Sequence, residues 1–223
     1  MDFQIALLLG QDGLTNGAIY ALLALALVLV FAVTRVIFIP QGEFVAYGAL
    51  TLAMLQAGKL PATLWMIAAL GAAIVVIDGA MAIRHGAARR LPRIVLSNLG
   101  VPLALLLIVP NINAAGLPLV AQIALTLAVV VPLGPMIYRL AYQPIAEAPV
   151  LILLIVSVAV HVVLIGLGLL FFGAEGTRTP AFTDGTLDLG VTTLQYQTLW
   201  ILAISAVLIV ALYAFFEIGR AHV

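Results

Sequence analysis

Long runs of apolar residues dominate the chain, and short polar stretches separate them. Each run is close to the roughly 20 residues that a helix needs to cross the hydrocarbon core of a bilayer. Runs such as YALLALALVLVFAV do not alternate between apolar and polar residues, as the strands of a membrane barrel would. The pattern therefore predicts an all-α, polytopic membrane bundle. About seven transmembrane helices are expected. Their approximate residue ranges are 14–34, 42–57, 62–83, 94–110, 119–138, 150–172 and 199–216.

Composition supports this class of protein. Of the 223 residues, 65% are hydrophobic and 8% are charged, whereas soluble domains carry about 25% charged residues. The chain has no cysteine, which excludes disulfides, thiolate metal sites and cysteine nucleophiles. The N-terminal MDFQIALLLGQDG has no basic residue and so does not resemble a secretory signal. We expect residues 1–217 to form one transmembrane domain that retains the first helix.

Basic residues predict the orientation in the membrane, because cytoplasmic loops collect Lys and Arg. The loop RHGAARRLPR is the most basic in the chain and is therefore expected inside. Alternation of the helices then places the N-terminus outside. It also places Arg35 and Arg139 in inside loops and leaves Lys59 and Arg178 outside. Trp65 and Trp200 fall at the outer interface, where Trp is enriched.

A few polar residues interrupt the apolar runs. Asp78 is either a group on a substrate or proton path, or a carboxylate that is solvated or paired near the inner interface; its place near the end of its run favours the second interpretation. His161 follows Ser157 by one helical turn, so the two side chains share one face. His161 is either a proton relay or a partner in one interhelical hydrogen bond, which is the commoner case.

These polar residues contain no paired carboxylates, no Ser-His-Asp spacing and no cluster of metal ligands. We therefore expect no catalytic residue, no metal and no cofactor, and we do not expect the chain to be an enzyme. The expected surroundings are membrane lipid, and no nucleic-acid partner is expected.

Two stretches depart from continuous apolar helix. Pro102, Pro132 and Pro135 interrupt expected spans, and VVVPLGPMIY is the strongest candidate for a kink because two prolines lie close together. The polar stretch 173–198 is expected outside. Within it, TLDLGVTTLQY has partial alternation, which leaves a short hairpin and a plain connecting loop as open alternatives.

Three separated blocks resemble the permease subunits of branched-chain amino-acid ABC transporters. The first is NGAIYALLALALVLVFAVTRVIFIPQGEFVAYGAL, the second is IYRLAYQPIAE and the third is GLLFFGAEGTRTPAF, in that order. The resemblance covers roughly residues 11–216. Two residues depart from the family pattern, because Gln41 stands where the family has His in its AHGE motif and Gln143 stands for Arg in YRP. The substrate is therefore open between branched-chain amino acids, other amino acids, amides and urea.

The resemblance implies a multi-pass permease in a bacterial inner (plasma) membrane that imports branched-chain or related amino acids. It also implies a second homologous permease subunit, two ATPase subunits and a periplasmic or extracellular substrate-binding protein. ATP hydrolysis is expected on the separate ATPase, because the chain has no GxxxxGK[ST] phosphate-binding motif. Its candidate substrate-path residues are Asn16, Tyr20, Gln41, Gly42 and Glu43.

Two alternatives remain open at this level. Glu43 has a sufficient structural role, because a carboxylate in the first turn of a helix is favoured by the helix dipole. The break at Pro40 and Gly42 equally fits an interrupted helix that exposes backbone groups toward a substrate path. The competing function is an ion-coupled secondary transporter or channel that uses the intramembrane residues Asp78 and His161.

The chain ends in IGRAHV, residues Ile218 to Val223. These residues match the translation of a common sequencing adapter, ATC GGA AGA GCA CAC GTC, which continues with the stop codon TGA. We therefore expect an artefactual tail. The resemblance implies a natural chain that continues into a cytoplasmic segment that docks on the ATPase.

Overall fold

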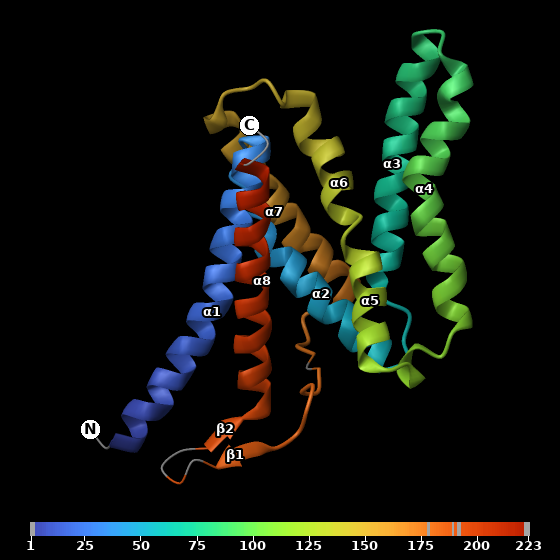
Figure 1. The fold of residues 1–223 in the computed structure, drawn as a ribbon. Coiled ribbons are helices and arrows are strands. Elements are labelled where there is room, and N and C mark those ends of the chain that lie inside the picture. The colour runs from blue at the N-terminus through green and yellow to red at the C-terminus, as the bar shows by residue number, and fades with distance from the viewer. Residues whose placement is uncertain (1–2, 178, 189, 191–192, 221–223) are drawn as a thin grey trace. The chain divides into compact units, whose positions relative to one another are not determined.

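The computed structural model describes residues 3–177, 179–188, 190 and 193–220, which are mostly helical (Figure 1). The longer elements are α1 (Phe3–Thr34), α2 (Gln41–Gln56), α3 (Ala62–Arg84), α4 (Leu91–Ile108), α5 (Leu119–Val130), α6 (Leu133–Ile137), α7 (Val150–Phe172), β1 (Thr186–Asp188), β2 (Thr193–Gln195) and α8 (Tyr196–Arg220). Short 3-10 helices are η1 (Ala88–Arg90), η2 (Val109–Asn111), η3 (Ala114–Gly116) and η5 (Gln143–Ile145), and η4 (Tyr138–Tyr142) is a π-helix.

Six helical stretches in the described residues are long and apolar enough to cross a membrane, which confirms the all-α polytopic class. They are Ile5–Thr34, Thr63–Arg84, Ala88–Asn111, Leu119–Ile145, Val150–Phe172 and Tyr196–Glu217. The second expected span is different, because α2 has 16 residues and is therefore about 24 Å long. That length is shorter than a hydrocarbon core of about 30 Å.

The described chain forms two compact units, Met1–Thr34 with Pro180–Val223, and Arg35–Thr179. In the first unit, α1 and α8 lie side by side and run in the same direction (Figure 1). Ahead of α8, β1 and β2 form an antiparallel hairpin in which Thr186 pairs with Gln195. The hairpin alternative for this stretch is therefore correct. Arg178, expected outside, and the tail residues 221–223 fall outside the described residues.

The parallel course of α1 and α8 constrains how often the chain crosses the membrane between them. If both helices span the membrane, α1 ends on one side and α8 begins on the other, so an odd number of crossings must connect them. The long helices between them are Thr63–Arg84, Ala88–Asn111, Leu119–Ile145 and Val150–Phe172, which is an even number. The sequence predicts this additional crossing at residues 42–57. If α2 makes it, the short helix shares the crossing with the non-helical residues 35–40 that precede it.

The core of the second unit lies where α2, α3, α5 and α7 meet. Leu55, Leu64, Val129 and Leu153 are almost fully buried there. On the other side of α3, α4 packs against it as an antiparallel hairpin (Figure 1). Gly71 permits this close approach, because a Cβ at that position would lie 2.5 Å from the backbone oxygen of Asn98.

The fifth expected span is broken at its prolines, as predicted. Helix α5 ends at Val130, α6 begins at Leu133, and the π-helix η4 follows. Proline removes a backbone donor, and π-helical turns widen a helix locally. Pro102, in contrast, lies inside α4 without ending it.

Arg139 corrects one expectation. It lies inside the helical stretch Leu119–Ile145 and not in a loop after it. The apolar run stops at this arginine, so a span estimated from the run ends too early. Within this helical stretch, the guanidinium of Arg139 pairs with the carboxylate of Asp78 on α3.

Candidate functional site

Residues 37–40 belong to the second unit, are not helical, and lead directly to α2. Val36 and Pro40 are buried. The backbone N–H of Ile39 donates a hydrogen bond to Oγ of Ser157 on α7, 3.0 Å away. Non-helical backbone at membrane depth is tolerated only where it is enclosed by protein and its polar groups are satisfied. Ser157 therefore provides the acceptor for the backbone N–H of Ile39 at this break in the helix.

From this break onward, α2 follows one face of α7 in the same direction. Glu43 lies opposite His161, and the hydroxyl of Tyr47 donates to the backbone oxygen of Leu164 at 2.7 Å. The contacts advance by about one helical turn along both helices. They place Ser157 and His161 on the same face of α7, as their spacing predicts.

The pair of Glu43 and His161 is the central feature of this contact. Oε1 of Glu43 lies 2.8 Å from Nδ1 of His161, and the two side chains are 16% and 33% exposed. The two atoms are within ion-pair distance, although their orientation does not make a hydrogen bond. The second carboxylate oxygen, Oε2, is buried and has no hydrogen-bond partner among the described residues. His161 is close to the middle of α7, which is long and apolar enough to cross a membrane.

These positions bear on the sequence interpretations. Glu43 does lie in the first turn of α2, which begins after Pro40, as the helix-start interpretation holds. His161 does contact a neighbouring helix, as the commoner interpretation holds. Sequence reasoning missed that each is the partner of the other. The sequence did contain one indication of this pairing, because Glu43 and His161 are each an isolated ionisable residue within an expected span.

A cavity of about 260 Å3 lies between α2 and α7, and we call it the α2–α7 cavity. One face of α2 from Glu43 to Leu50 lines it, together with Leu164 to Leu169 of α7 and residues 173–176 after α7. The cavity therefore extends from the buried Glu43 toward the loop that follows α7.

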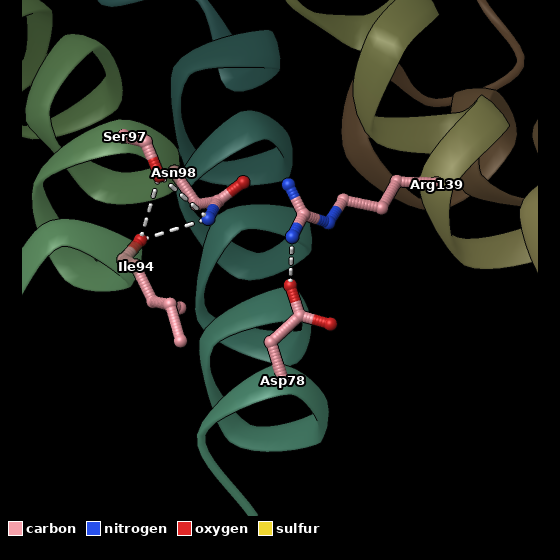
Figure 2. A network of polar contacts seen from close by, with 5 residues as sticks. All are labelled: Asp78, Ile94, Ser97, Asn98 and Arg139. Carbon is pink, nitrogen blue, oxygen red and sulfur yellow. Dashed lines mark hydrogen bonds and ion pairs between the residues drawn. The ribbon is translucent and has the colours of Figure 1, made fainter. Parts of the chain in front are cut away.

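A second charged pair lies elsewhere in the same unit. Nη2 of Arg139 in η4 is 2.5 Å from Oδ2 of Asp78 on α3. Figure 2 shows the guanidinium reaching from its own helix toward the carboxylate. On α4, Nδ2 of Asn98 donates to the backbone oxygen of Ile94 at 2.8 Å and to Oγ of Ser97 at 3.1 Å (Figure 2). Asp78 is thus paired, as the interpretation favoured above expects.

Two further cavities border Arg139. One, of about 350 Å3, is also lined by Asp78 and Gln143. The other, of about 320 Å3, is lined by Asn98 and by prolines of α4 and of the α5–α6 break. Arg139 thus lines both cavities, and Asp78 lines the first of them.

The remaining candidate residues divide between the two units. Asn16 and Tyr20 lie on α1 in the first unit, where Tyr20 is 70% exposed. Gln41 and Gly42 begin α2 in the second unit, directly before Glu43. The structure therefore groups Gln41, Gly42 and Glu43 with His161 and Ser157. It assigns Asn16 and Tyr20 to a different unit.

The described residues contain no group of three or more His, Cys, Asp and Glu side chains that could hold a metal ion. Comparison with known proteins adds no relative: no family model, no curated protein and no solved structure matches the chain.

Proposed function

We propose that the chain is a transmembrane permease subunit of an ABC importer for branched-chain or related amino acids. The resemblance of three separated sequence blocks to that family supports the proposal. The structural observation that carries it is the interrupted crossing at residues 35–56, where α2 begins deep in the protein beside the α2–α7 cavity. Interrupted helices with their N-termini at the middle of the membrane form the substrate sites of many transporters.

In this proposal, the chain works in a bacterial inner membrane with a second permease subunit, two ATPase subunits and an external binding protein. The chain itself supplies part of the translocation path and hydrolyses nothing. A helix start such as Gln41–Gly42 suits a zwitterionic substrate, because backbone N–H groups at a helix start attract carboxylates.

Reconstitution tests this function directly. The full-length product of the natural gene is placed in proteoliposomes with the ATPase, second permease and binding protein encoded beside that gene, and uptake of labelled L-leucine is measured with and without internal ATP. ATP-dependent uptake that disappears with a hydrolysis-deficient ATPase is the expected result. Uptake that continues with the hydrolysis-deficient ATPase and stops when a proton uncoupler is added would overturn the proposal.

That second outcome would favour the competing function, an ion-coupled transporter or channel. The contact between Glu43 and His161 is the specific observation in its favour. A carboxylate beside a histidine inside a membrane bundle is an arrangement that proton relays use.

A further inference from the structure

We propose that the connection between α3 and α4 binds the phosphate head groups of anionic phospholipids in the leaflet that it faces. Four arginines carry the inference, and we call them the arginine cluster: Arg84, Arg89, Arg90 and Arg93. The inference goes beyond the proposed function. It requires only that α3 and α4 cross a membrane, and it holds for an importer and for an ion-coupled transporter alike.

The fold brings the arginine cluster together at one end of the α3–α4 hairpin. Arg84 is the last residue of α3, and Arg93 lies in the first turn of α4. Arg89 and Arg90 lie between them in η1. Gly86 has a positive φ of 70°, which turns the chain out of α3 and keeps the connection short. No other element of the second unit lies beside this end of the hairpin (Figure 1).

The protein does not compensate the charge of the arginine cluster. All four side chains are exposed, and neither of the ion pairs within the described residues involves them. The first turn of α4 has no acidic residue, and the sequence contains no Asp or Glu between Asp78 and Glu147. Like charges that lie close together repel one another. This end of the hairpin therefore favours an anionic partner.

The apolar side chains beside the cluster indicate that this partner is a lipid head group. Ile83 on α3 and Leu96 on α4 are 61% and 74% exposed. Both belong to helical stretches that are long and apolar enough to cross a membrane. Their exposed surfaces would contact acyl chains, and residues 85–87 alone separate α3 from η1, so the arginines stay close to the edge of the hydrocarbon. That edge is where lipid phosphates lie.

The chemistry of arginine fits this position. A guanidinium binds a phosphate through two parallel hydrogen bonds, and basic clusters directly beside a membrane helix attract anionic lipids. The arginine cluster thus combines an uncompensated charge, a suitable donor geometry and an apolar border. A soluble anion would account for the first two features and not for the third.

Lipid competition tests the inference with the 223-residue chain purified in detergent. The chain is mixed with equal amounts of the anionic lipid POPG and the zwitterionic lipid POPC, which have the same acyl chains. Native mass spectrometry then measures how much of each lipid remains bound. We expect about tenfold more bound POPG than POPC. Equal binding of the two lipids would overturn the proposal.

Removal of single charges locates the site. Arg89→Gln and Arg93→Gln should each lower the ratio of bound POPG to POPC about fivefold, whereas Arg89→Lys should retain most of it. Lys59→Gln is the matched control, because Lys59 is also exposed and basic and lies before the opposite end of α3. It should leave the ratio nearly unchanged, and a control effect equal to that of Arg89→Gln would overturn the proposal. Thermal unfolding without added lipid checks that the variants are folded.

Two further measurements distinguish a lipid from other anionic partners. Glycerophosphoglycerol, the head group of POPG without acyl chains, should not displace POPG at the same concentration. Displacement would assign the cluster to a soluble anion and overturn the proposal. The full-length product of the natural gene, in POPC nanodiscs, should bind its ATPase equally well with and without Arg89→Gln. Loss of ATPase binding in the variant would assign the cluster to a protein contact and would also overturn the proposal.

Discussion

The two charged pairs of the second unit differ in their basic partner and in the elements that they join. The guanidinium of Arg139 pairs with Asp78 and links η4 to α3. The imidazole of His161 lies beside Glu43 and links α7 to α2. Each pair borders a cavity, and each leaves a buried carboxylate oxygen without a hydrogen-bond partner among the described residues, Oδ2 of Asp78 and Oε2 of Glu43. The two pairs therefore differ in the helices that they hold together and in how exposed their basic partners are, 41% for Arg139 and 33% for His161.

The largest expected effect concerns the membrane topology, because a reagent that cannot cross the membrane either labels a cysteine from one side or does not label it. Single cysteines replace Ala88, in the basic α3–α4 connection, and Ala181, in the loop before the hairpin; both residues are exposed. We expect a membrane-impermeant maleimide to label Ala181→Cys from outside and Ala88→Cys only after the membrane is opened. Labelling of both from the same side would break the predicted orientation.

Among the substitutions, removal of the charge of Arg139 should give the largest change in the free energy of unfolding. Arg139→Met leaves Asp78, which is 16% exposed, without its counter-charge. Breaking a buried pair costs roughly 3–5 kcal/mol, and the partial exposure of Arg139 suggests the lower end, about 3 kcal/mol. Thermal unfolding in detergent measures the loss. The double variant Asp78→Asn with Arg139→Met should recover most of it, and equal stability of the single and double variants would contradict a structural pair.

The break before α2 should be the next most sensitive position. Ser157→Ala removes the acceptor of the Ile39 N–H and the partner of the Tyr142 hydroxyl, which lies 3.1 Å away. A buried donor left unsatisfied costs about 1–3 kcal/mol, so we expect a loss of about 2 kcal/mol. Ser97→Ala is the matched control, because Ser97 is exposed and bonds only within its own helix among the described contacts. A larger loss from Ser97→Ala would contradict this assignment.

The second pair should contribute least to stability. His161→Leu removes one interhelical contact worth roughly 1 kcal/mol in a membrane, and the ABC proposal expects uptake to continue. Unfolding and uptake are measured on the same preparation. Loss of uptake at normal protein levels would instead indicate a proton relay and would support the ion-coupled alternative.

The sequence predicted the features that depend on local pattern. Apolar runs located the long helices, and Pro132 and Pro135 located the break in the fifth span. The pairings could not be predicted, because Asp78 with Arg139 and Glu43 with His161 join residues far apart in the chain. An apolar run also ends at its first charge, which placed Arg139 in a loop although the helix continues. The hairpin of β1 and β2 could be named only as an alternative, since its strands have three residues each.

The hydrogen bond between Ile39 and Ser157 has a consequence for biogenesis. A translocon releases a segment into lipid when that segment is apolar, long enough and internally hydrogen-bonded. Residues 35–56 meet neither the length nor the bonding requirement, because α2 is short and Ile39 needs an acceptor that α7 provides. The ribosome makes Ser157 long after Ile39. We therefore expect residues 35–56 to insert stably only after α7 has been synthesised and its Ser157 can accept this hydrogen bond.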